Sequence, residues 1–130
     1  MADVTVKRLE EFDAVFGGAM KRVRAGLGVK SFGMQVVDLP PNLDAYPEHA
    51  HSSDGQEEVY TLLEGAATLR VGDDTYELTP GVFARVGPGE RRKFVTKEQP
   101  ARILCLGGVP EQVYEPPQWS EEGAEPPRPP

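Results

Sequence analysis

The only two histidines of the chain, His49 and His51, are separated by a single residue. In an extended segment, side chains two positions apart point to the same side, so both imidazole rings can reach one metal ion. An H-x-H pair alone is weak evidence, because such pairs are often exposed and inert. A few residues later, Glu58 and Tyr60 share one face of a predicted strand.

If that face points into the protein, the Glu58 carboxylate needs a cation or a proton, because an unpaired buried charge is very costly. Two histidines and one carboxylate form the facial set that holds non-haem Fe(II), and these donors also suit Mn, Zn, Ni or Cu. The sequence therefore predicts a divalent transition metal on His49, His51 and Glu58.

Short strands separated by turns are predicted for the middle of the chain. Glycine (14) and proline (13) are abundant, which favours short strands over a helical bundle. Strands are predicted at 31–39, 57–63, 66–71, 75–78, 83–86, 93–96 and 101–106. Some are apolar on both faces, as at 59–63, which suits a closed barrel or a sandwich better than an open sheet. The fold class is therefore all-β, with Phe32, Met34, Phe83 and Phe94 as expected core residues.

Three parts of the chain are predicted. Residues 1–29 form an N-terminal extension, with a short strand at 4–6 and helical turns between residues 12 and 27. Residues 30–110 form the β-domain. Residues 111–130 hold six of the 13 prolines and are expected to form a flexible tail. Tyr114 and Trp119 are candidates for packing back on the domain.

The motifs of this chain resemble those of the cupin superfamily. Residues 49–65 are similar to the first cupin motif: H-x-H, a gap, Glu58, six residues and Gly65. Residues 81–96 resemble the second motif in a degenerate form, and a single hairpin separates the two. The chain looks most like small, single-domain bacterial members of the cupin_2 type. The resemblance implies one small antiparallel β-barrel of jelly-roll type, a metal site inside it, and a homodimer.

Three features depart from the family pattern. Six residues separate His51 from Glu58, where three or four are usual, so Glu57 is a rival for the role of acidic ligand. Gly87 stands where proline is usual. Arg92 occupies the position of the last histidine ligand, and a guanidinium cannot ligate a metal because it has no free lone pair.

Arg92 allows three interpretations. In the first, its guanidinium forms a pair of hydrogen bonds to a carboxylate or phosphate of a substrate next to a bound metal, and Tyr60 is a second substrate-binding residue. Alternatively, it pairs with Glu58 in a metal-free site. In the third interpretation it points outward beside Arg91 and Lys93.

Composition limits the class of partner. The chain has 130 residues, enough for one domain, and a net charge of −7 from 14 basic and 21 acidic residues. The negative charge argues against nucleic acid and against anionic membranes. One cysteine, Cys105, allows no internal disulfide and lies in an apolar run typical of a buried core. Without a spanning segment or a signal peptide, the chain is expected to be cytoplasmic.

Two functions follow as hypotheses. The first is a metal-binding cupin that binds or acts on a small, anionic organic molecule, with oxidoreductase or isomerase chemistry as the enzymatic possibility. The alternative is a metal-free small-molecule sensor or a structural dimer module, in which Arg92 pairs with Glu58.

Overall fold

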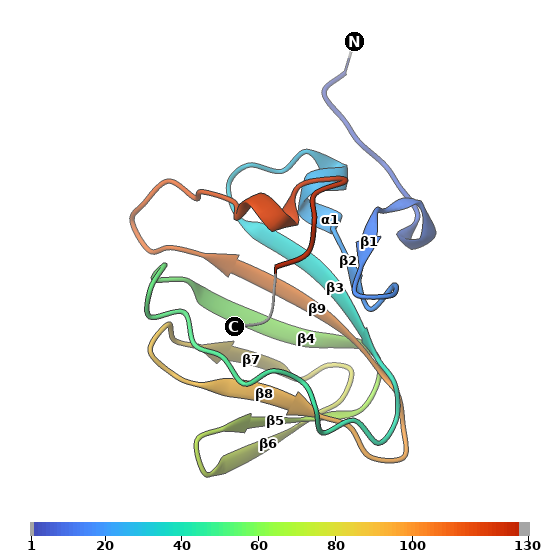
Figure 1. Ribbon diagram of the computed structural model, residues 1–130, viewed down its shortest axis with the longest axis vertical. Coiled ribbons are helices and arrows are strands. Elements are labelled where there is room, and N and C mark those ends of the chain that lie inside the picture. Colours follow the sequence, from blue (N-terminus) through green and yellow to red (C-terminus); the bar gives the residue numbers. More distant parts are fainter. Residues whose placement is uncertain (1, 128–130) are drawn as a thin grey trace.

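Two antiparallel sheets make up the fold of residues 2–127, which are the residues that the computed structural model describes (Figure 1). In spatial order, the larger sheet contains β1 (Ala14–Val15), β2 (Met20–Lys21), β3 (Gly33–Leu39), β9 (Ala101–Gly108), β4 (Glu57–Gly65) and β7 (Phe83–Val86). The smaller sheet contains β6 (Asp74–Leu78), β5 (Ala67–Val71) and β8 (Arg92–Val95). The predicted all-β class is confirmed, and each predicted strand from residue 31 onward has a counterpart within a few positions.

The core lies between the two sheets. Inward residues of both sheets form one buried cluster, which includes Leu62, Leu69, Leu78, Phe94 and Ile103. Within residues 2–127, no ladder joins the larger sheet to the smaller one. The domain is therefore a jelly roll of two facing sheets, and the closure expected of a barrel is not detected.

Two phenylalanines expected in the core lie at the surface instead. Phe83 is 73 % exposed and Phe32 is 42 % exposed, whereas Phe94 is buried. On β7 only Val86 is buried, while Phe83 and Arg85 on the opposite face are exposed. The prediction for Phe83 was wrong because alternation along a strand gives two faces but does not say which of them meets the core.

The N-terminal segment differs from its prediction in detail. The strand expected at 4–6 is wrong: Val4 and Val6 are exposed and belong to no strand. After η1 (Leu9–Glu11), a hairpin joins β1 to β2 through Gly17 and Gly18, both at positive φ. These glycines form a turn, where the spacing of apolar residues had suggested helix. Helix α1 is only Val23–Leu27 and ends at Gly28, which adopts a left-handed conformation.

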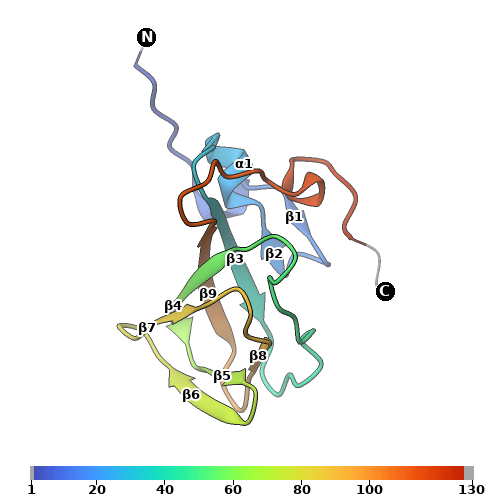
Figure 2. The same ribbon diagram turned by 90° about the vertical axis from the view of Figure 1, so that its left-hand side faces the viewer.

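The C-terminal segment packs back against the N-terminal segment (Figure 2). Tyr114 and Ser120 are buried, and Ser120 is the last residue of the short helix η2 (Gln118–Ser120). The guanidinium of Arg24 pairs with Glu121 at 2.8 Å, and that of Arg22 donates to the carbonyl of Ala124 at 2.7 Å. The division into 1–29, 30–110 and 111–130 stays a prediction, and residues 128–130 lie outside the described residues.

None of the helices within residues 2–127 has the length and apolar character needed to span a bilayer.

Candidate metal centre

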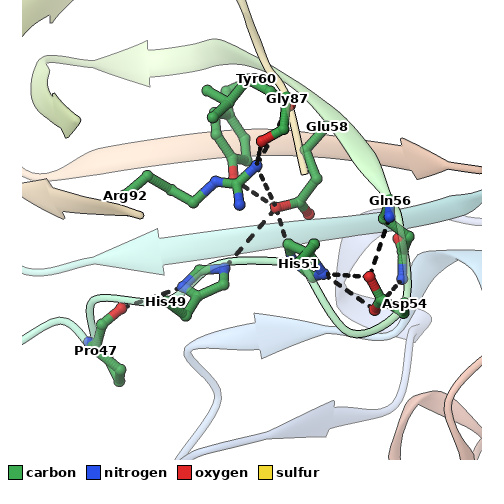
Figure 3. A network of polar contacts seen from close by, with 10 residues as sticks. Pro47, His49, His51, Asp54, Gln56, Glu58, Tyr60, Gly87 and Arg92 are labelled. Atoms are coloured by element: carbon green, nitrogen blue, oxygen red, sulfur yellow. Dashed lines mark hydrogen bonds and ion pairs between the residues drawn. The ribbon is translucent and has the colours of Figure 1, made fainter. Parts of the chain in front are cut away.

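Two histidines and one glutamate converge near the first residues of β4 (Figure 3). One ligand atom from each of His49, His51 and Glu58 lies within 4.8 Å of the others. Nε2 of His51 is 3.0 Å from Oε1 of Glu58, and Nε2 of His49 is 3.8 Å from the same oxygen. These three residues, called the triad below, are a possible metal-binding site.

Backbone hydrogen bonds hold the histidines in place despite the long loop before Glu58. His49 and Arg92 form an antiparallel bridge, with N–H to O distances of 3.0 and 2.8 Å. The amide of His51 donates to the carbonyl of Pro88 at 2.8 Å. The extra residues curl into a turn in which Gly55, at φ 75°, donates back to His51. The loop is therefore attached to the strand-and-turn segment of the second motif.

Both imidazoles are oriented by a second contact at Nδ1 (Figure 3). Nδ1 of His49 is 3.2 Å from the carbonyl of Pro47, and Nδ1 of His51 is 3.1 Å from the carboxylate of Asp54. Carbonyl and carboxylate oxygens accept hydrogen bonds, so each Nδ1 carries the proton and donates. In the neutral rings, both Nε2 lone pairs then point toward Glu58. Metal-ligating histidines typically have this kind of outer partner.

Glu58 is held as an anion in a mostly buried position. Burial alone would raise its pKa, but the neighbouring imidazoles of His49 and His51 and the hydrogen bond from Tyr60 outweigh burial and hold the pKa of Glu58 far below its usual range. The hydroxyl of Tyr60 donates to Oε1 at 2.6 Å, and burial followed by the Glu58 charge raises the pKa of Tyr60. Tyr60 therefore remains a neutral donor that fixes the carboxylate.

Glu57, the rival carboxylate, lies on the opposite face of β4. Its Oε1 accepts from Nε of Arg85 at 2.8 Å at the protein surface. Successive strand residues alternate between faces, so Glu57 and Glu58 cannot both point to the histidines. The acidic member of the triad is Glu58.

Arg92 is fully buried, so the interpretation in which it points outward is wrong. Its Nη2 donates to the carbonyls of Val86 and Gly87 at 3.3 and 3.1 Å and lies 3.9 Å from Oε1 of Glu58. Its Nε and Nη1 have no hydrogen-bond partner among residues 2–127. A loose contact with Glu58 therefore exists, but the closest partners of the guanidinium are backbone carbonyls.

The triad borders a cavity of about 550 Å³. Tyr60 lines this cavity, as predicted for a pocket residue, whereas Arg92 is not among the lining residues. The lining also includes Gln35, Tyr46, Cys105 and Trp119, to which the sequence had given no role in a site. Of these four, Gln35 alone carried a usable signal, because it is a polar residue between the apolar Met34 and Val36.

Cys105 was expected to be a buried core residue. It packs against the core and also borders the cavity, next to Tyr60 on the neighbouring strand. Burial, followed by the Glu58 charge, raises the pKa of the Cys105 thiol. The thiol therefore stays protonated at neutral pH and offers the cavity a soft, weakly polar surface.

The fold and the convergent triad together define a cupin. The chain belongs to the Cupin_2 family of cupin domains, because the family's model matches residues 35–107. No curated protein matches the sequence.

Solved structures share the fold over most of this chain. A cupin protein from Bacteroides fragilis is 18 % identical, with a TM-score of 0.70 over 90 % of this chain and 93 % of that one. A sugar phosphate isomerase of the cupin superfamily from Silicibacter pomeroyi is 23 % identical, with a TM-score of 0.66 over 80 % and 75 %. The DMSP lyase DddQ from Ruegeria pomeroyi is 27 % identical, with a TM-score of 0.55 over 71 % and 45 %.

Metal affinity is expected to rise with pH. The hydrogen bond to Glu58, opposed by burial and helped by Asp54, raises the pKa of His51 above 6.5 in the metal-free fold. A metal must displace the proton from Nε2, so affinity should fall about tenfold per pH unit below that raised pKa and level off above it. Titrations of the chelator-treated protein with Zn²⁺ between pH 5.5 and 8.5 would measure this; a flat profile would contradict it.

The metal-free fold should show the opposite trend in stability. A raised folded-state pKa means that the stabilisation from His51 is complete below pH 6.5 and is lost as pH rises through the raised value. Urea unfolding of the metal-free protein over the same pH range would measure this fall in the free energy of unfolding.

Proposed function

We propose that the protein is a metal-binding cupin that holds one divalent transition metal on His49, His51 and Glu58 and binds or transforms a small organic molecule in the adjoining cavity. One observation carries the proposal. Nδ1 of each imidazole has a hydrogen-bond partner outside the triad, so Nε2 of each ring is left to face the Glu58 carboxylate. Such a set requires a cation, either a proton or a metal ion.

The donor set fits Fe, Mn, Zn, Ni or Cu. A metal bound here supplies Lewis acidity, and a redox-active one supplies electron transfer as well. The surrounding residues have separate tasks: Asp54 and the Pro47 carbonyl orient the rings, and Tyr60 fixes Glu58. Two structures that share this fold are named as a sugar phosphate isomerase and a DMSP lyase, which supports an enzymatic role on a small molecule.

Metal reconstitution tests the proposal. The chelator-treated protein is dialysed separately against Fe²⁺ under anaerobic conditions and against Mn²⁺, Zn²⁺, Ni²⁺ and Cu²⁺, and its metal content is measured by elemental analysis. We expect one metal ion per chain with at least one of these ions. Substoichiometric binding of all five would overturn the proposal and favour the metal-free alternative.

The metal-free alternative rests on the 3.9 Å contact between Arg92 and Glu58. In that case the chain is a ligand-binding or structural dimer module. We propose a homodimer for both the metal-binding and the metal-free function, and light scattering of the purified protein would test it.

Arg92→His is expected to raise metal affinity at least tenfold, which corresponds to about 1.4 kcal/mol. Residues 49 and 92 face each other in the antiparallel bridge, so an imidazole at position 92 would stand on the same side as His49. The substitution removes a cation near the site and adds a donor. Chelator competition measures the change.

Arg92→Met is the matched control for that variant, because it removes the charge without adding a donor. A gain shared equally by both variants would assign the effect to charge alone. No gain in Arg92→His would contradict the expected placement of the side chain.

A further inference from the structure

Both ends of the chain build the apolar side of the cavity. Phe16 and Met20 of the N-terminal hairpin and Trp119 and Pro127 of the C-terminal segment line it, together with Leu43 and Tyr46 of the loop after β3. The C-terminal segment lies near α1 and the β1–β2 hairpin, which forms one edge of the larger sheet (Figure 1 and Figure 2). These side chains give the cavity a largely hydrocarbon and aromatic surface.

The C-terminal part of this wall is anchored by two buried arginines. Nη1 of Arg22 contacts Asp13 at 2.7 Å, and the same carboxylate accepts from the amide of Gly123 at 2.8 Å. Arg24 pairs with Glu121 at 2.8 Å. The side chains of Arg22 and Arg24 are 2 % and 5 % exposed, whereas Asp13 and Glu121 are 35 % and 43 % exposed, so each pair joins a buried arginine to a carboxylate at the surface. The segment that carries Trp119 is therefore fixed in place and forms part of the pocket.

The charges around the cavity limit the ligand's charge. Among residues 2–127, the charged side chains of the lining are Asp38 and Glu58, and neither lysine nor arginine lines it. Asp38 is already paired with Lys21 at 3.2 Å and Arg102 at 2.7 Å. A divalent metal with Glu58 as its one anionic ligand leaves a single positive charge, which one carboxylate would neutralise. A phosphate dianion would contact no lysine or arginine side chain of the lining, because Arg92, the cation beside Glu58, is fully buried and lies outside the lining.

One polar group of the wall is left without a partner. Oε1 of Gln35 is buried and has no hydrogen-bond partner among the described residues. Gln35 pairs in register with Cys105, and Cys105 pairs with Tyr60, so two strand spacings of about 4.8 Å each separate Gln35 from Tyr60. A buried acceptor without a donor is costly, and Gln35 lines the cavity, so a ligand hydroxyl roughly 10 Å from Tyr60 would relieve that cost once the amide turns toward the cavity.

We propose that the site takes a monocarboxylate with an apolar or aromatic body, that Trp119 packs on this body, and that Gln35 accepts a hydrogen bond from a hydroxyl at its far end. The inference rests on the proposed function, since the metal supplies the positive charge for the carboxylate. It separates this chain from the sugar phosphate chemistry named for one of its structural neighbours.

Calorimetric titration of the metal-loaded protein tests the ligand class, with 3-phenylpropionate, acetate and ribose 5-phosphate as probes. We expect 3-phenylpropionate to bind at least tenfold tighter than acetate and ribose 5-phosphate. Equal or tighter binding of ribose 5-phosphate would overturn the inference. A protein that loads no metal would overturn the proposed function itself, so the two failures are distinguishable.

Trp119→Ala tests whether the C-terminal segment contributes to ligand binding in the cavity. The variant should lose roughly tenfold in affinity for 3-phenylpropionate, keep its weak affinity for acetate, and retain one metal ion per chain. Trp119→Phe is the matched control that keeps an aromatic ring and should lose less. Unchanged affinity in Trp119→Ala would overturn the role of the C-terminal segment. Metal content and melting temperature report whether the variant is folded.

A pair of ligands tests Gln35. The phenol of 3-(4-hydroxyphenyl)propionate adds a donor at the far end, so this compound should bind more tightly than 3-phenylpropionate. The difference should disappear in Gln35→Leu, which removes the amide and retains a similar volume. The same preference in wild type and variant would overturn the assignment of Gln35.

Discussion

His51→Ala is expected to lower metal affinity by at least about 100-fold, so that protein purified after metal supplementation holds little metal. The loss of an outer partner alone typically costs 10–100-fold, and this substitution removes a ligand. His49 is the only other histidine of the chain and already belongs to the triad, so no further imidazole can replace His51. Elemental analysis and chelator competition measure the loss.

The two adjacent glutamates provide the matched control. Glu58→Gln should lose metal as His51→Ala does, because Oε1 of Glu58 faces both imidazoles and accepts the hydrogen bond from Tyr60. Glu57→Gln has the same chemistry one position away and should keep full metal content, since Glu57 pairs with Arg85 at the surface. Equal metal content in both glutamine variants would place the metal elsewhere.

Phe94→Ala is expected to destabilise the fold by about 3–5 kcal/mol, which is the usual cost of removing a buried phenylalanine. Phe94 is 1 % exposed, and its ring lies edge-on to Tyr60 at 4.8 Å and to Tyr46 at 5.2 Å between centroids. The cavity left behind would also remove support from the tyrosine that holds Glu58. Urea unfolding gives the free energy, and a fall in melting temperature of roughly 10–20 °C should accompany it.

Phe83→Ala is the control for that measurement. Phe83 is 73 % exposed, so its removal should change the free energy of unfolding by no more than about 0.5 kcal/mol. A similar loss in both variants would contradict the assignment of the core to the space between the sheets.

The strands and the triad were predictable because both depend on local patterns. Alternation places Glu58 and Tyr60 on one face of β4, and the spacing of His49 and His51 places their rings together. Turn residues such as those at 72–74 mark where strands end. The positions of the strands in space follow from the family resemblance, which the match over residues 35–107 confirms.

The environment of Arg92 could not be read from its neighbours. It lies between Arg91 and Lys93, a context that suggests a solvated run, yet it is 0 % exposed and donates to the carbonyls of Val86 and Gly87. Its burial results from the bridge to His49, 43 positions away in the chain. Strand alternation sets which neighbours share a face, but only the pairing partner decides which face is enclosed.

The sequence by itself determined the all-β class, the positions of the main strands and a candidate metal site made of His49, His51 and an adjacent glutamate. Only the tertiary structure decided that Glu58 rather than Glu57 faces the histidines, that Arg92 is enclosed, and that Gln35 and Trp119 meet at the same cavity. The physical reason is range. Side-chain direction along a strand depends on adjacent residues, whereas a pocket wall depends on which distant segments pack together, and composition and periodicity carry little information on that packing.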